Sequence, residues 1–336
     1  MALVTFESRD KNSPGTETSV TSRTSSGQIR HLLSAGDLRI NEVDELCQAA
    51  DEFEAGSVPT QPRSNKTVAL LFFQSSTRTR LGFEAATVAL GAHPIGMEDM
   101  SMSRTNSKIG ETLEDCAAVV SRLCDAIIVR HHEVGAAARM AAASVVPVIN
   151  AGDGWNEHPS QALIDIYAMR RGLGSLRGKS IAFGGDPRGR VVRSFMQLLR
   201  FEAPREVVFC PPPHYPVPAD VVQLITENQI GFRLIPDIDH ALKECDAIMM
   251  APYDMSAVAE PASSSYVSPH ETPEPFTITA EKIERLDSKA LLYHPLPRFD
   301  EINPSCDFLP NAQYFEQVRL SKFMRMAVLD RLLSAY

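Results

Sequence analysis

The chain has 336 residues, of which 44% are hydrophobic and 22% charged, a composition typical of a globular protein with room for two domains. The formal net charge of −9 argues against a nucleic-acid binder, because no domain-wide basic excess is available to neutralise phosphate backbones. No apolar stretch reaches the ~18 residues that span a bilayer, so we expect no membrane association.

The six cysteines are scattered and show neither zinc-ligand spacing nor a disulfide framework. Free thiols in a reducing compartment are the simplest interpretation, and we expect a cytoplasmic protein. Residues 1–28 are rich in Ser and Thr and lack apolar periodicity, which predicts a mobile tail. A transit peptide is the alternative, but Glu7, Asp10 and Glu17 count against it.

After the tail, apolar residues at helical spacing predict a helix that begins near residue 40. Strands and helices then alternate. We expect strands at 68–73, 93–97, 126–129 and 146–149. We expect helices at 77–91, 110–123, 135–143 and 159–170, the last of which crosses into a second unit.

The second unit restarts the alternation. Its predicted strands are 180–183, 207–209, 232–235, 247–250 and 290–293. Its predicted helices are 189–201, 219–228, 238–244 and an amphipathic helix at 320–334 that closes the chain. Residues 251–277 lack periodicity and predict a long loop, which in a compact domain is usually functional or disordered.

Two successive runs of strand and helix indicate an α/β protein with two doubly wound domains, mainly parallel sheets and helices linking the domains. We expect one domain to comprise 29–165 together with the C-terminal helix 320–336, and the other to comprise 166–319. Ligands of such folds bind beyond the carboxyl ends of the strands. Four polar clusters follow predicted strands, which indicates one cleft between the domains.

The first cluster, Ser75 to Arg80, follows the apolar strand 68–73 and opens a helix. Free N–H groups and the helix dipole favour an anion at a helix start. Hydroxyl groups and two arginines add donors suited to phosphate. A capped helix start with a solvated cationic turn is the structural alternative, and phosphate binding is the hypothesis we favour.

The other clusters are less specific when taken singly. Arg130 directly follows four apolar strand residues and is expected to face the cleft. His158 precedes a proline and could simply begin a helix with Pro at its first position. The turn Gly184-Gly185-Asp186 lacks the full G-x-G-x-x-G fingerprint, so it does not favour a dinucleotide site.

Together the clusters form an ordered series of motifs: Ser-Thr-Arg-Thr-Arg (76–80), Ile-Val-Arg-His (128–131), Asn-Ala-Gly-Asp-Gly-x-Asn-x-His-Pro-x-Gln (150–161) and His-Pro-Leu-Pro-Arg (294–298). From about residue 30 onward the chain resembles the aspartate/ornithine carbamoyltransferase family. The stretch His-Pro-Leu-Pro-Arg-x-Asp-Glu-Ile (294–302) is similar to the aspartate branch.

The resemblance implies carbamoyl transfer from carbamoyl phosphate to an amine, without metal or organic cofactor. By analogy the phosphate would be held by Ser76, Thr77, Arg78 and Thr79. The carbonyl oxygen would receive hydrogen bonds from Thr79, Arg130 and His158. The carbamoyl amide would be bound by Gln161 and the backbone of Pro295 and Leu296. We expect Arg78, Thr79, Arg130 and His158 to be catalytic.

The resemblance also implies how the amino-acid acceptor binds. Arg190 and Leu296 would contact the acceptor, and Lys108 of a neighbouring copy could reach the same cleft. Family members are trimers with active sites shared across subunits, so a homotrimer is implied, either alone or within a larger assembly. The expected ligands are small molecules, namely carbamoyl phosphate and an amino acid.

The chain departs from the aspartate pattern on the acceptor side. Ile109 stands where the loop from the neighbour usually carries lysine, and Val191 replaces the threonine after Arg190. Pro252 and Asp254 replace an arginine and a glutamine. Arg188 or Arg193 could compensate, but residues 251–281 contain no Lys or Arg.

Three functions therefore stay open. The first, which we favour because the surrounding motifs are aspartate-like, is formation of N-carbamoyl-L-aspartate in pyrimidine biosynthesis. The second is carbamoyl transfer to a different amine, such as one with a single carboxylate or one with an added cation that Asp254 could meet. The third is a degenerate, non-catalytic partner subunit within a larger assembly.

Overall fold

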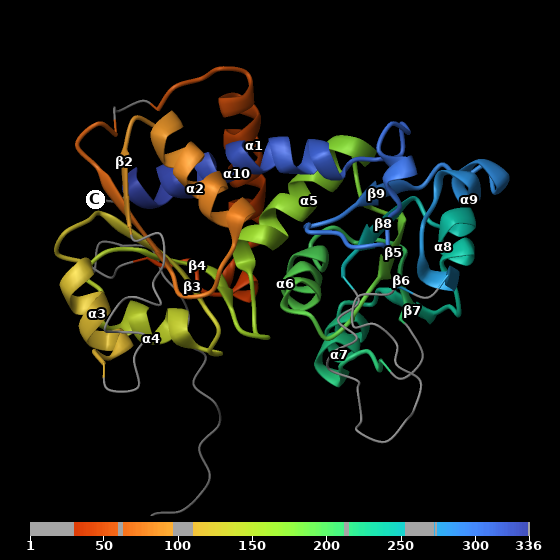
Figure 1. The fold of residues 1–336 in the computed structure, drawn as a ribbon, viewed down its shortest axis with the longest axis horizontal. Helices are drawn as coiled ribbons and strands as arrows, with labels where there is room; N and C mark the ends of the chain where they lie inside the picture. The colour runs from red at the N-terminus through yellow and green to blue at the C-terminus, as the bar shows by residue number, and fades with distance from the viewer. Residues whose placement is uncertain are drawn as a thin grey trace, which may run out of the picture.

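The computed structural model describes residues 30–59, 63–96, 110–211, 215–252, 272 and 274–334. The predicted tail (1–28), Lys108, Ile109 and Asp254 lie outside these residues. Two lobes lie side by side, each built on its own parallel sheet, with α5 (Pro159–Leu173) running between them (Figure 1). Within the described residues, no helix is both long and apolar enough to cross a membrane.

The first lobe contains a four-stranded sheet in the order β2-β1-β3-β4, and all its neighbouring strands are parallel. These strands span His93–Gly96, Thr67–Phe72, Ala126–His131 and Val148–Asp153. The helices are α1 (Ile40–Glu54), α2 (Thr77–Ala89), α3 (Leu113–Val120) and α4 (Ala136–Ala143). In Figure 1, α1 and α2 lie on one side of the sheet and α3 and α4 on the other.

The second lobe contains a five-stranded parallel sheet in the order β7-β6-β5-β8-β9. These strands span Gly231–Leu234, Glu206–Cys210, Ser180–Gly184, Ala247–Met250 and Leu291–Tyr293. The helices are α6 (Arg190–Leu199), α7 (Ala219–Glu227), α8 (Ile238–Glu244) and α9 (Ala280–Arg285). The final helix, α10 (Tyr314–Ser334), starts beside this sheet and ends in the first lobe (Figure 1).

The α/β class with two parallel sheets is confirmed, and most predicted elements occur within a few residues of their expected bounds. Three details differ. Arg130 and His131 lie inside β3 and not after it, because the strand keeps its pairing to β4 across a bulge. Helix α10 begins at Tyr314, more than one and a half turns before the predicted residue 320. Helix α9 was not predicted.

Strand alternation builds the core. In β1, Val68, Leu70 and Phe72 belong to one apolar cluster, while Ala69 and Leu71 belong to a second cluster on the opposite face. A sheet that is covered on both faces needs such continuous apolar runs. The first of these clusters continues through α5, α6 and α10 into the second lobe, so the two sheets are joined by shared core.

Gly185 fixes the turn between β5 and α6 and gives a test of this packing. Its φ is +116°, and a Cβ there would lie 2.3 Å from the carbonyl oxygen of Ala251. Gly178 also has a positive φ (+72°), but its added Cβ would meet nothing within 4 Å. We expect Gly185→Ala to lower the free energy of unfolding by roughly 2–4 kcal/mol, through backbone strain and overpacking.

Gly178→Ala is the matched control for backbone strain alone and should cost about 1 kcal/mol. Urea unfolding of both variants measures the difference. Equal losses for the two variants would contradict a close backbone approach at Gly185.

Candidate active site between the sheets

The predicted donor-side residues come from three adjacent strands of the first sheet. β1 leads into α2, whose N-cap is Ser76, and Arg130 in β3 pairs in register with Phe72 at the end of β1. β4 leads to His158, the N-cap of α5, with Pro159 at the first helical position. Because β1, β3 and β4 are neighbours in a parallel sheet, their carboxyl ends deliver these residues to one edge.

The start of α2 combines several features that favour an anion. Ser76 has an extended backbone, no acidic residue occupies the first turn, and Thr79 is buried. Arg78 is partly buried, which lowers the pKa of its guanidinium. Among the described residues it has no hydrogen-bond or ion-pair partner. The turn therefore combines free N–H groups, hydroxyls and an uncompensated cation.

The buried surroundings of Arg130 disfavour the positive charge of its guanidinium. Its Nη1 donates to the carbonyl oxygen of Ala151 at 3.2 Å, while its buried Nε has no partner among the described residues. Burial, followed by repulsion from Arg190 and Arg78, lowers the pKa of Arg130 to about 9. The guanidinium groups of Arg78 and Arg190 thus repel that of Arg130, an arrangement that a bound anion would relieve. Of the three groups, Arg190 is also attracted by the carboxylate of Asp153.

Gly152 explains how two of these guanidinium groups come so close together. An added Cβ at this glycine would lie 3.1 Å from Nη1 of Arg130 and 3.2 Å from Cζ of Arg190. Its φ of +113° is also strained for any other residue. The glycine in the Asn-Ala-Gly-Asp motif therefore leaves room for both side chains.

His158 is buried and neutral. Burial lowers its pKa well below the usual value, and repulsion from Arg130, Arg190 and Arg325 lowers it further. Its backbone N–H donates to Ser194 Oγ at 2.8 Å, which fixes the start of α5 against α6. A neutral imidazole in this place can donate one hydrogen bond, but it is a poor proton carrier near neutral pH.

Gln161 lies one turn further along α5. Its Nε2 donates to the buried carboxylate of Asp165 at 2.7 Å, which leaves its Oε1 as an acceptor. A cavity of about 390 Å³ brings Gln161 together with Thr77, Arg78 and Pro295. These four residues, from α2, α5 and the segment after β9, thus share one cavity.

The turn after β9 can only accept hydrogen bonds. Pro295 has no N–H, and the N–H of Leu296 donates to Nδ1 of His294 at 2.7 Å. Leu296 has a φ of +55°. Its carbonyl and that of Pro295 suit a ligand that donates, such as an amide NH₂ group.

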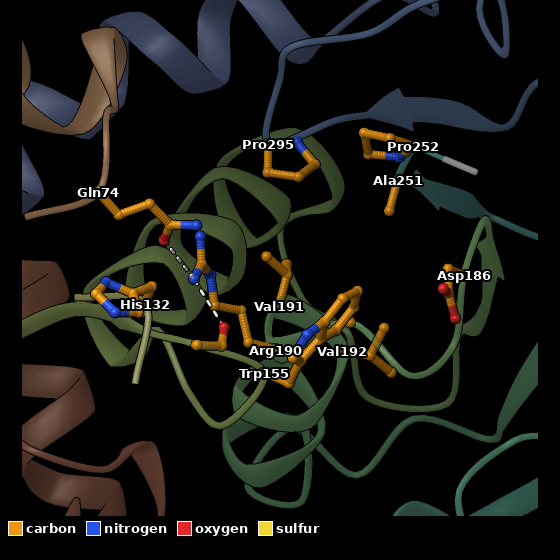
Figure 2. Close-up of a pocket in the computed structure, with 12 residues that line it drawn as sticks. Gln74, His132, Trp155, Asp186, Arg190, Val191, Val192, Ala251, Pro252 and Pro295 are labelled. Carbon is orange, nitrogen blue, oxygen red and sulfur yellow. Dashed lines mark hydrogen bonds between the residues drawn. The ribbon is translucent and has the colours of Figure 1, made fainter. Parts of the chain in front are cut away.

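The predicted acceptor side is a cavity of about 460 Å³ that shares Pro295 with the first cavity (Figure 2). Arg190, the first residue of α6, donates through Nη1 to Gly154 O (2.8 Å) and Gln74 Oε1 (3.1 Å). Val191 and Pro252 line the same cavity, as the sequence suggested. Lys108 and Asp254 lie outside the described residues.

The two arginines that could compensate are already paired. Arg188 forms a two-pronged contact with Asp186, at 2.9 and 2.7 Å. Arg193 donates to Asp220 at 2.7 Å and to the carbonyl of Trp155 at 2.9 Å. Arg190 is therefore the one cation in the described lining of the cavity.

Sequence reasoning missed several residues of this cavity: Gln74, His132, Trp155 and Asp186. Gln74 directly follows the predicted first strand, so its position at a strand end was a usable signal. Trp155 occupies the first of three variable positions in the Asn150–Gln161 motif, and nothing in the pattern marked it. Figure 2 shows it among the side chains that line this cavity.

One group of described residues has ligand atoms spaced for a metal ion. His131, His132 and Glu133 place such atoms within 4.8 Å of one another. The N–H of Glu133 donates to Nδ1 of His131 at 2.9 Å, so the proton of this neutral ring is on Nε2. Neither nitrogen then offers a free lone pair, and the group does not fit a resident metal.

The fold and this edge of arginines, hydroxyls and amide groups define a two-domain α/β protein with a candidate anion site between its sheets. Family comparisons agree. "Aspartate/ornithine carbamoyltransferase, carbamoyl-P binding domain" matches residues 30–171, and "Aspartate/ornithine carbamoyltransferase, Asp/Orn binding domain" matches residues 177–332. The chain belongs to the aspartate/ornithine carbamoyltransferase family.

Individual relatives cover nearly the whole chain. The aspartate carbamoyltransferase catalytic subunit of Methanocorpusculum labreanum is 36% identical over 91% of this chain and 98% of its own. That of Archaeoglobus fulgidus is 34% identical over 91% and 99%.

Solved structures resemble the fold closely. The catalytic subunit of M. jannaschii aspartate transcarbamoylase has a TM-score of 0.80 at 33% identity, covering 90% of this chain and 98% of that chain. Aspartate transcarbamoylase from Trypanosoma cruzi in complex with carbamoyl phosphate and aspartate has a TM-score of 0.78 at 28% identity, covering 91% and 97%.

The buried carboxyl of Asp165 gives a pH-dependent test of the site. Burial raises its pKa to about 7, against about 3.9 in an unfolded chain. Between these values the native state binds more protons, so its stability should fall as pH rises from about 4 to 7. Relative to Asp165→Asn, wild type should lose about 3 kcal/mol of unfolding free energy over this range.

Asp307→Asn is the control, because the pH dependence of stability that it removes runs in the opposite direction. The hydrogen bond from Arg298 lowers the pKa of Asp307, so its carboxylate contributes stability that is lost as pH falls. Urea unfolding at a series of pH values measures both variants. A constant difference between wild type and Asp165→Asn would show that Asp165 does not titrate in this range.

Proposed function

We propose that this protein transfers the carbamoyl group of carbamoyl phosphate to the α-amino group of L-aspartate, giving N-carbamoyl-L-aspartate for pyrimidine biosynthesis. The observation that carries the proposal is the anion site at the start of α2, where Arg78 and Arg130 meet without a facing carboxylate. The names of the relatives support aspartate as the acceptor.

The residues suit the chemistry of acyl transfer. The start of α2 and Arg78 would hold the phosphate, and the amine would attack the carbonyl carbon. Negative charge then grows on the carbonyl oxygen, which Thr79, Arg130 and neutral His158 would stabilise as preplaced donors. One such donor is typically worth ~3–4 kcal/mol of transition-state stabilisation.

The remaining acceleration would come from positioning. The carbamoyl NH₂ can only donate, and Oε1 of Gln161 and the carbonyls of Pro295 and Leu296 can only accept. Departing phosphate can take the proton from the amine. The described residues therefore supply donors and acceptors for each polar group of carbamoyl phosphate, and no step needs a protein group to carry a proton.

The assembly is proposed from family membership. A homotrimer with shared active sites, alone or within a larger assembly, would bring Lys108 of one copy to the cleft of its neighbour. A cytoplasmic location and a carbamoyl phosphate domain formed by 29–165 with the end of α10 are part of the same proposal. The acceptor domain would then be 166–319.

The donor site is tested by titrating carbamoyl phosphate into the full-length protein in a calorimeter. Wild type should bind saturably, and Arg78→Ala should abolish measurable binding because it removes the phosphate-facing cation. Arg177→Ala is the control, since Arg177 is an exposed arginine in a surface turn of the other lobe. Unchanged binding in Arg78→Ala would refute the proposed donor site.

A different amine acceptor is the second candidate, and the lining of the 460 Å³ cavity favours it. Arg190 is the one cation of the described lining, whereas Val191, Ala251 and Pro252 form an apolar wall. Residues 251–281 contain no Lys or Arg, so this segment cannot add a guanidinium or an ammonium group. A dicarboxylate would leave one carboxylate against apolar groups, whereas an apolar amino acid with one carboxylate would not.

Phosphate release with a panel of amines separates the candidates. L-aspartate should support turnover, and Pro252→Arg should lower the KM for aspartate about tenfold, because a guanidinium added to the apolar wall would pair with the second carboxylate. Pro252→Gln is the uncharged control. Turnover of apolar amino acids but not aspartate would establish the second candidate. Binding without turnover of any amine would favour the non-catalytic partner subunit.

A further inference from the structure

The groups proposed to bind the carbamoyl amide belong to different parts of the fold. Gln161 lies in α5, whereas Pro295 and Leu296 follow β9 of the second sheet. Both sets must hold a fixed separation if they are to accept two hydrogen bonds from one small NH₂ group. A side chain that bonds to both parts would therefore control how the amide is recognised.

Gln317, in the first turn of α10, is placed to do this. It is buried, and its Oε1 accepts from the backbone N–H of His294 at 2.9 Å. Its Nε2 donates to Oδ1 of Asp165 at 2.6 Å. The same carboxylate oxygen accepts from Nε2 of Gln161 at 2.7 Å.

The orientation of the Gln317 amide is fixed by its partners. The N–H of His294 requires an acceptor and the carboxylate of Asp165 is best served by a donor, so the oxygen and nitrogen cannot exchange places. The oxygen of Asp165 in turn orients Gln161, leaving Oε1 of Gln161 for a ligand. One end of Gln317 thereby sets the α5 side of the amide site.

The other end of Gln317 sets the turn after β9. The side chain of His294 is fully buried, its Nδ1 accepts from the N–H of Leu296 at 2.7 Å, and its Nε2 lies 2.7 Å from Glu301 Oε1. Because Nδ1 accepts, Nε2 carries the proton and donates to Glu301. His294 therefore holds the turn that presents the carbonyls of Pro295 and Leu296.

We propose that Gln317 is a positioning residue that joins these two sets of acceptors across the domains and so makes the donor site selective for a carbamoyl over an acetyl group. The inference rests on the proposed function, because it concerns the amide of carbamoyl phosphate. Acetyl phosphate carries a methyl group in place of the NH₂ and cannot use the acceptors that Gln317 positions.

The test compares three ligands by calorimetry on the full-length protein: carbamoyl phosphate, acetyl phosphate and inorganic phosphate. Wild type should prefer carbamoyl phosphate over acetyl phosphate by at least about tenfold. Gln317→Met keeps the length of the side chain but removes both hydrogen bonds. It should lose most of that preference, while affinity for acetyl phosphate and inorganic phosphate stays within about twofold.

Gln313→Met is the matched control. Gln313 lies just before α10, and its Nε2 donates only to the carbonyl of Pro310 at the surface. Its ligand preference should equal that of wild type. Asp165→Asn keeps an oxygen for both glutamine amides and should also retain the preference. Asp165→Ala cuts the link from the other side and keeps the proposal testable if Gln317→Met does not fold.

Two results would overturn the inference. One is an unchanged preference in folded Gln317→Met and Asp165→Ala. The other is an equal loss of affinity for all three ligands, which a merely structural role would produce. Neither is confused with failure of the proposed function, because in that case wild type itself would not bind carbamoyl phosphate.

Discussion

The repulsion of Arg130 by Arg78 and Arg190 is the constraint on which the rest of this structure depends. Burial lowers the pKa of all three guanidinium groups, and repulsion by the other two arginines lowers that of Arg130 further. Like charges can be held together in a folded protein only if many other contacts fix the elements that carry them. An anion bound among them would be stabilised by a site that the protein has prepared in advance.

The shared apolar core supplies that fixation. Arg78 lies in the first turn of α2, Arg130 is the last residue but one of β3, and Arg190 begins α6, so the three charges come from both lobes. The largest apolar cluster runs without interruption from the first sheet through α5 and α10 to the second sheet. The elements that carry the arginines cannot separate without disturbing this core. Packing remote from the site thus holds the charges in place.

The sequence predicted the parts of the site that local order determines. Ser76 to Thr79 follow a strand and open a helix, and both signals lie within a few residues. Arg130 was expected beyond its strand because apolar character ends at Val129, whereas backbone pairing to β4 continues to His131. Hydrogen-bond ladders do not stop where side-chain burial stops.

Tertiary contacts that no local pattern encodes were not predictable. The start of α10 was missed because Gln317 occupies a buried position with a polar side chain, which interrupts the apolar periodicity. Its burial makes sense only with Asp165 and His294 beside it, which are far away in sequence. The pairing of Arg188 with Asp186 likewise became clear only in three dimensions, although the two residues are close in the chain.

The course of α10 also limits how the two lobes can move. The helix starts at the second sheet, where Gln313 donates to Leu292, and its last turns are tied to the first lobe by ion pairs of Asp330 with Arg63 and of Arg331 with Glu45. Because this continuous helix is anchored in both lobes, the lobes cannot rotate freely toward each other. Closure around a ligand would have to bend α10 or slide it along its neighbours. Substitutions that loosen the C-terminal end of the helix would therefore also affect the cleft.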